Sequence, residues 1–217
     1  MKIYDISMSL DTPMLTYPKD VPYKRSLQRS LARGHSSNVS EITTSAHVGT
    51  HIDSPHHYIA DGYAVEDIPL DHLYGPVSVI DCTGAKVVTA ELLRDKIPPS
   101  ARRILLKTDN SPLLSDKTQL SFNPNFVYLS NDGAQLLVDR NIILVGIDYL
   151  SIDQSGNAEK AAHHILLGNN ITIMEGVVLT EVPPGEYFLA CGPLKMVGSD
   201  GAPCRAVLIK DINRQSE

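Results

Sequence analysis

The chain has 217 residues, of which 42% are hydrophobic and 20% charged, values that suit one folded domain and exclude a disordered or coiled-coil protein. The formal net charge is −6 and no basic stripe stands out, so no nucleic-acid partner is expected. The apolar runs are short and the N-terminal residues lack the apolar stretch of a signal peptide, which predicts a cytoplasmic protein with no membrane span. Histidine is the unusual residue: four of the eight lie between 47 and 57.

In chain order, short apolar runs predict a strand-rich domain. The expected strands lie near residues 2–6, 42–53, 77–82, 103–108, 142–147, 171–174, 177–182, 186–191 and 204–210. The expected helices are one over 90–95 capped by Thr89, one from Ser130 to before Ile142, and one over 158–167 closed by Gly168 and Asn169. Regular alternation of strands and helices is missing, so we expect an α/β fold with a mixed sheet, as one domain over residues 1–217.

The segment 45–57 carries the most specific chemical signal. A helix is disfavoured there because three β-branched residues and a glycine interrupt it and a proline follows. A strand would place His47, His51 and Asp53 on one face, with Gly49 leaving open space between the two imidazoles. Two imidazoles and a carboxylate with room for water are the ligands of a catalytic metal site.

Three more residues extend this hypothesis. His57 lies beyond Pro55 and could move protons at the metal, because an imidazole titrates at about pH 6.5; a surface histidine is the equal alternative. His163 lies on the expected third helix, and Glu175 follows an apolar strand where a buried carboxylate needs a partner. Taken by themselves, these two are more simply a surface histidine and a solvated strand end.

The motif His47-x-Gly-Thr-His51-x-Asp53-x-Pro-x-His57 resembles the signature of the metal-dependent hydrolases that include bacterial kynurenine formamidase and isatin hydrolase, often labelled "putative cyclase". The resemblance extends over nearly the whole chain. It is carried further by Asp5-Ile-Ser, Tyr17-Pro18, Asp61-Gly62, Gly75-Pro76-Val77, residues 103–108 and 146–153, the 12-residue spacing of His163 and Glu175, and Asp200-Gly-Ala-Pro203-x-Arg205.

The resemblance implies a swivelling β/β/α domain with a divalent metal on His47, His51 and Asp53. In the formamidase branch a second metal is held with help from a later histidine and glutamate, here His163 and Glu175, and the aspartate can bridge the two ions. The last histidine of the motif, His57, is the proton shuttle. Zn²⁺ suits such ligands best, and Mn²⁺ is the alternative. The resemblance also implies a homodimer or higher homo-oligomer and a small-molecule substrate.

The implied reaction is hydrolysis of an amide bond by metal-activated water, first of all in an arylformamide such as N-formylkynurenine, an intermediate of tryptophan catabolism. Tyr17 is the implied substrate-binding residue. The formamidase branch usually shows Trp-Pro-Gly-Asp there, whereas this sequence has Tyr17-Pro-Lys-Asp20 and no tryptophan. Two alternatives stay open: a hydrolase of a lactam or cyclic imide such as isatin, and a metal-binding protein without turnover.

Overall fold

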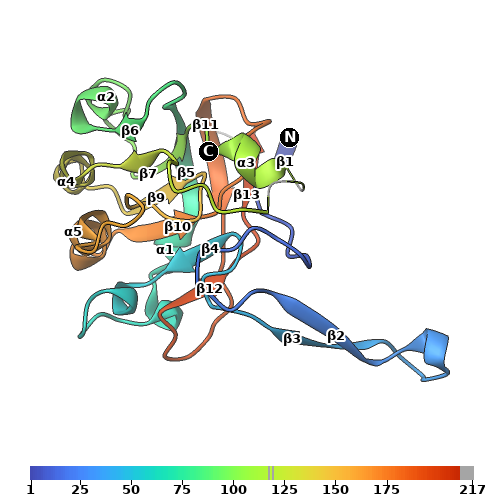
Figure 1. The fold of residues 1–217 in the computed structure, drawn as a ribbon. Coiled ribbons are helices and arrows are strands. Elements are labelled where there is room, and N and C mark those ends of the chain that lie inside the picture. Colours follow the sequence, from blue (N-terminus) through green and yellow to red (C-terminus); the bar gives the residue numbers. More distant parts are fainter. Residues whose placement is uncertain (117, 119, 211–217) are drawn as a thin grey trace, which may run out of the picture.

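A nine-stranded sheet dominates the computed structural model, which describes residues 1–116, 118 and 120–210. Its order is β1-β13-β11-β5-β7-β9-β10-β4-β12. These strands are β1 (Lys2–Asp5), β4 (His51–Asp53), β5 (Tyr74–Asp81), β7 (Arg103–Lys107), β9 (Leu144–Ile147), β10 (Thr172–Glu175), β11 (Gly185–Ala190), β12 (Gly201–Pro203) and β13 (Val207–Lys210). Parallel and antiparallel pairs both occur, and the sheet curls into a half-barrel (Figure 1), which confirms the predicted mixed-sheet α/β fold.

The central strands β5, β7, β9 and β10 run parallel and are covered on both faces, which explains their nearly continuous apolar sequences. Three helices, α2 (Ala90–Arg94), α4 (Asn131–Asp139) and α5 (Ala161–Gly168), stack along one face (Figure 1). Successive residues of β7 serve both layers: Ile104 and Leu106 pack under the helices, while Leu105 packs into a second core inside the curl. The site described below lies at the β10–β4 end of this sheet.

The remaining elements are short. They are α1 (Leu70–Leu73), α3 (Ser111–Ser115), the parallel pair β6 (Val87–Val88) and β8 (Tyr128–Leu129), the hairpin of β2 (Lys24–Arg29) and β3 (Val39–Thr43), and single 3₁₀ turns at Leu31–Arg33, Pro55–His57 and Val65–Asp67. No helix in the described part of the chain is long and apolar enough to cross a membrane.

Two predicted caps begin their helices as expected. Thr89 Oγ1 accepts a hydrogen bond from the backbone N–H of Leu92, and Ser130 Oγ accepts one from Gly133 at 3.2 Å. The third predicted helix begins three residues late, at Ala161, because the preceding Lys160 has a left-handed backbone with φ 46° and ψ 45°.

Ser130→Ala is expected to lower the free energy of unfolding by about 1 kcal/mol, because it removes the cap of α4. The same hydroxyl donates a hydrogen bond to the carbonyl of Val88, which ties α4 to β6. Chemical denaturation measures the effect, with the exposed Ser100→Ala as the matched control. Equal unfolding midpoints for the two variants would contradict the capping role.

The predicted strand over 42–53 is wrong in its middle. β3 ends at Thr43, β4 begins only at His51, and a turn lies between them. Gly49 has φ +60°, a left-handed conformation that cannot continue a strand. β3 instead pairs with β2 in a hairpin that projects from the body of the molecule (Figure 1).

The predicted strand over 177–182 is also wrong. Gly176, at φ +69°, turns the chain out of the sheet directly after β10, and Val177 makes only an isolated bridge to Ser7. The apolar side chains that suggested a strand, Val177, Leu179 and Val182, fill the core inside the curl without pairing in the sheet. At the other end, the predicted strand 204–210 is shorter, at 207–210, and β12 precedes it.

Candidate metal centre

The register of β4 against β10 builds the inner part of the site. His51 and Asp53 are two residues apart on β4 and therefore face the same side, and Glu175 of β10 lies directly opposite His51. All three are buried. His51 Nε2 lies 3.4 Å from Asp53 Oδ1 and 3.5 Å from Glu175 Oε2. The Nδ1 atom of His51 hydrogen-bonds the carbonyl of Gly49 at 3.0 Å, which leaves Nε2 directed at the two carboxylates.

α5 supplies a second buried imidazole to this cluster. His163 Nε2 lies 3.2 Å from Glu175 Oε1 and 3.6 Å from Asp53 Oδ2. Its other nitrogen, Nδ1, lies 2.5 Å from Asp153 Oδ2, and the Asp153 carboxylate also accepts the backbone N–H groups of Ala162 and His163. Asp153 thus caps α5 and fixes the ring so that Nε2 faces the cluster. The neighbouring His164 is exposed.

His47 reaches the cluster from the turn between β3 and β4, not from the predicted strand face. Its Nδ1 lies 2.8 Å from Asp53 Oδ1, and its Nε2 lies 2.8 Å from Asp200 Oδ2. The ring packs against Gly201, where a Cβ atom would lie 2.8 Å from His47 Cε1. The predicted convergence of His47, His51 and Asp53 therefore occurs, through a different local structure.

Two left-handed glycines hold this turn against β10. A Cβ atom on Gly176 would lie 2.2 Å from the carbonyl oxygen of Gly49, so the two backbones meet where no side chain fits. Thr50 Oγ1 donates a hydrogen bond to the carbonyl of Gly176 at 2.6 Å and accepts one from the backbone N–H of Met8 at 2.8 Å. The position of His47 is thus set by buried backbone packing.

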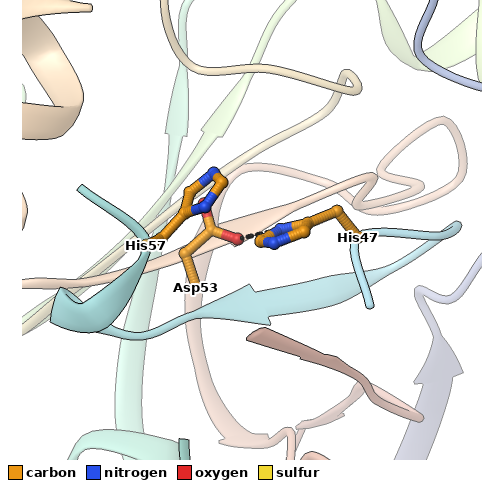
Figure 2. Close-up of side chains that lie close together, drawn as sticks. All are labelled: His47, Asp53 and His57. Carbon is orange, nitrogen blue, oxygen red and sulfur yellow. Dashed lines mark hydrogen bonds and ion pairs between the residues drawn. The ribbon is translucent and has the colours of Figure 1, made fainter. Parts of the chain in front are cut away.

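His57 lies in the 3₁₀ turn that follows β4. Figure 2 shows His47 and His57 reaching Asp53 from different segments of the chain. The His57 ring stacks on His47 with centroids 4.1 Å apart, and its Nδ1 lies 3.4 Å from Asp200 Oδ2. Burial lowers the pKa of His57 below its ordinary value, so the ring is neutral at pH 7. A neutral, partly exposed imidazole can accept a proton.

The histidines and carboxylates of the cluster hold one another in charged form. Burial opposes the charge on His51, but the nearby carboxylates of Asp53 and Glu175 outweigh it and raise its pKa to about 10. Burial likewise opposes the charge on His47, yet Asp53 raises its pKa to about 8. Burial favours the neutral form of Asp53, but the surrounding imidazoles keep its pKa well below the usual range. A metal ion must displace these protons, so metal affinity is expected to decrease as the pH is lowered.

The donor set fits a divalent metal ion. Among the described residues, His51 Nε2 and Asp53 Oδ2 are buried without a hydrogen-bond partner, a costly condition that a metal would relieve. Ligands of a tetrahedral Zn²⁺ lie about 3.3 Å apart. The contacts that join His51 and His163 to Asp53 and Glu175 span 3.2 to 3.6 Å.

Asp53 belongs to two groups of candidate ligands. The ligand atoms of His51, Asp53 and Glu175 lie within 4.8 Å of one another, and so do those of His47, Asp53 and His57. The arrangement therefore has the donors for one ion and offers a second position that shares Asp53.

Sequence reasoning missed Asp153 and Asp200 as contributors to the site. Both residues enter the sequence analysis only within longer stretches that carry the family resemblance, residues 146–153 and the segment from Asp200 to Arg205. Asp153 lies well before α5, whose N-cap position is Lys160, so no local capping pattern predicts that its carboxylate accepts the backbone N–H groups of Ala162 and His163. Asp200 contacts His47 across 153 positions of the chain, so no local pattern could place it there.

Asp153→Asn is expected to weaken metal affinity by about 10- to 100-fold, because the amide cannot hold the His163 ring as the carboxylate does. Competition with a chelating dye measures the affinity, and the exposed Asp95→Asn serves as the control. An unchanged metal affinity would show that Asp153 only caps the helix.

A cavity of about 170 Å³ opens beside the cluster. It is lined by Tyr17, Asp20, His47, His57, Tyr58, Leu150, Ser151, Lys160, His163 and Glu175. Tyr17 therefore lies on the wall of the pocket, where the resemblance places a substrate-binding residue. A larger cavity of about 400 Å³, between residues 7–15 and α3, includes none of the cluster residues.

Comparisons with known proteins agree with this geometry. The family described as "Putative cyclase" matches residues 4–154. The kynurenine formamidase of Salinibacter ruber is 37% identical over 210 residues, which is 96% of this chain and 97% of the relative. The structure of a predicted metal-dependent hydrolase from Bacillus stearothermophilus is 31% identical with a TM-score of 0.81, covering 95% of this chain and 97% of that one.

A fourth comparison bears on the fold alone. Isatin hydrolase A from Ralstonia solanacearum is 23% identical with a TM-score of 0.82, covering 96% of this chain and 92% of that one. The buried histidines and carboxylates beside a pocket, together with these relatives, place the chain among the metal-dependent hydrolases. Within that class, the chain belongs to the "Putative cyclase" family.

Proposed function

We propose that this metal-dependent amide hydrolase cleaves an arylformamide, with N-formylkynurenine as the first candidate. The observation that carries the proposal is the buried cluster of His47, His51, Asp53, His163 and Glu175, which opens into a pocket with His57 on its wall. The relative described as a kynurenine formamidase, which aligns over nearly the whole of both chains, supports the substrate class.

His51, Asp53, His163 and Glu175 would hold the ion, and Asp53 also belongs to the group of candidate ligands that would hold a second ion. A divalent ion held there would supply Lewis-acid chemistry, which would polarise the formyl carbonyl and lower the pKa of water towards about 7. His57 accepts the proton that the attacking water releases. The same ring returns it to the amine nitrogen as the C–N bond breaks, which yields formate and an arylamine. The Asp200 carboxylate lies 3.4 Å from His57 Nδ1, where it would favour the protonated ring between the two transfers.

Zn²⁺ is the proposed ion and Mn²⁺ the alternative, because imidazole and carboxylate ligands suit both. Metal analysis of the purified protein, coupled to an arylformamide assay, tests the proposal directly. Chelator treatment is expected to remove the metal and the activity together, and added Zn²⁺ or Mn²⁺ is expected to restore them. If metal-free protein hydrolysed the substrate as fast as metal-loaded protein, the proposal would be wrong.

A lactam such as isatin is the second candidate substrate. The specific observation in its favour is the small cavity of about 170 Å³, lined by Tyr17 where the formamidase branch usually has tryptophan. Parallel assays with a formanilide and with isatin distinguish the two reactions. A metal-binding protein without turnover is disfavoured, because binding alone does not require a proton-transfer group such as His57 beside the site.

The proposed assembly is a homodimer, in which the β2–β3 hairpin docks on a second copy of the chain. Every residue of both strands is exposed, including the apolar Leu27, Val39 and Ile42. A two-stranded ribbon is marginally stable alone. Residues 24–43 carry four basic and one acidic residue, a charge of +3. Since the net charge of the whole chain is −6, the other residues together carry −9. A basic arm thus complements an acidic body.

Sedimentation analysis tests this assembly. The wild-type chain is expected to sediment as a dimer, and Leu27→Asp with Ile42→Asp is expected to shift it towards the monomer. The exposed Leu70→Asp, outside the hairpin, is the control. A monomeric wild type, or a dimer that survives the hairpin substitutions, would contradict the docking role of the hairpin.

A further inference from the structure

Lys160 is the only lysine or arginine among the described residues that line the pocket. None of the ion pairs formed within the described part of the chain includes it. Its Nζ lies 3.4 Å from the hydroxyl oxygen of Tyr17 and 5.7 Å from the centre of the Tyr17 ring. The pocket therefore has a cluster of buried carboxylates and imidazoles on one side and a half-buried cation without an acidic partner on another.

The backbone holds this cation in a strained position. Lys160 adopts the left-handed conformation, which costs a residue with a Cβ atom free energy that glycine would not lose. Lys160 directly precedes α5, whose His163 faces Asp53 and Glu175. Asp153 holds the first turn of this helix by accepting two of its backbone N–H groups. Strained residues of this kind persist at functional sites when the surroundings hold them. The backbone that carries the Lys160 side chain is thus held next to the helix that supplies His163.

Tyr17 is positioned independently of Lys160. Its ring packs edge to face on Phe122 with centroids 5.2 Å apart, within a cluster that includes Phe126 and Tyr149. The Tyr17 hydroxyl and the Lys160 ammonium therefore offer two neighbouring hydrogen-bond donors on the pocket wall. Neighbouring donors of which one is charged are suited to a carboxylate, and a charge-assisted hydrogen bond is stronger than a neutral one.

We propose that Lys160, together with the Tyr17 hydroxyl, binds a carboxylate on the substrate, so that the substrate class is an arylformamide carrying an acidic side chain. The inference rests on the proposed function and deepens it. The formamide group would lie at the candidate metal ligands and the carboxylate at Lys160, so separate protein groups would bind the two ends of the substrate. Lys160 is then a specificity-determining residue and takes no part in the bond cleavage.

A matched pair of substrates tests this role in the full-length, metal-loaded protein. The acidic member is 4-(2-formamidophenyl)-4-oxobutanoate, and the neutral member is its primary amide, which has nearly the same size. The measured quantity is the ratio of kcat/KM for the acid to that for the amide. Lys160→Met is expected to lower this ratio by about 10- to 100-fold, mainly through KM, because a hydrogen bond to a charged group is lost. Lys160→Arg keeps the charge and is expected to recover much of the ratio.

The controls separate recognition from structure. Lys86→Met, an exposed lysine outside the pocket, is expected to keep the wild-type ratio, and metal analysis checks that Lys160→Met retains the ion. An unchanged ratio in Lys160→Met overturns the proposal. An equal loss on both substrates also overturns it, because a structural defect would not distinguish acid from amide.

A binding measurement keeps this inference apart from the proposed function. The product acid, 4-(2-aminophenyl)-4-oxobutanoate, and its amide are titrated into metal-loaded wild type and Lys160→Met. The variant is expected to lose about 10- to 100-fold of its preference for the acid. If wild type hydrolyses neither formamide but shows this preference and its loss, arylformamide hydrolysis fails and carboxylate recognition stands. Equal preference in both proteins refutes the role of Lys160, whatever the turnover.

Discussion

His51→Ala is expected to lose bound metal and turnover together. The imidazole is buried, its Nδ1 hydrogen-bonds Gly49, and its Nε2 lies between the carboxylates of Asp53 and Glu175. Alanine removes a proposed ligand and leaves two buried carboxylates without their shared imidazole. A catalytic metal ion stabilises the transition state by several kcal/mol, and about 1.4 kcal/mol corresponds to a tenfold change in rate. Loss of the ion is therefore expected to lower kcat/KM by about a thousandfold or more.

Metal analysis and the arylformamide assay on the same preparation measure both losses. His164→Ala is the matched control, since this histidine is exposed next to a predicted ligand. Circular dichroism shows whether the variant remains folded, because the buried carboxylates also lose a stabilising partner. Retention of stoichiometric metal with a wild-type rate in folded His51→Ala would rule out His51 as a ligand.

The second large effect is expected for His57→Ala, which should keep the metal and lose rate. A positioned acid–base group contributes about 10²- to 10⁴-fold, and kcat is expected to fall within that range. The ring lines the pocket and stacks on His47, but the cluster of His51, Asp53, His163 and Glu175 is complete without it. Single-turnover kinetics with metal-loaded protein measure the chemical step.

His56→Ala is the control for this substitution, because His56 is the exposed neighbour in the same 3₁₀ turn. Loss of a metal ion in His57→Ala would also have a structural explanation. His57 belongs with His47 and Asp53 to the second group of candidate ligands. If His57→Ala lost an ion in proportion to its rate, His57 would be a ligand and the proton shuttle would have to be another group.

Alternation along the sequence predicted part of the site correctly and part of it for the wrong reason. His51 and Asp53 lie on β4 and share a face, as a period of two requires. His47 was assigned to the same face, but Gly49 takes a left-handed conformation and places His47 in a turn. The residue interpreted as open space between two imidazoles is the point where the strand cannot continue. Hydrophobic alternation does not reveal the sign of φ.

The remaining contributors depend on contacts that no local pattern contains. Asp200 approaches His47 because β12 pairs with β4, and Lys160 contacts Tyr17 across 143 positions of the chain. The caps at Thr89 and Ser130 were predictable, since a cap depends on residues three positions away. The family spacing of 12 linked His163 to Glu175, but only the fold shows that His163 is buried and His164 exposed.

The position of β10 between β9 and β4 determines at which point during synthesis the candidate metal ligands can come together. The segment that supplies His47, His51 and Asp53 leaves the ribosome well before α5 and β10, which supply His163 and Glu175. A growing chain therefore cannot enclose an ion until β10 has taken its place in the sheet, and a half-made chain binds at most through exposed ligands. If these five residues hold the ion, metal retention requires β10 to be in the sheet, and a chain truncated before β10 is expected to leave the ion in solution.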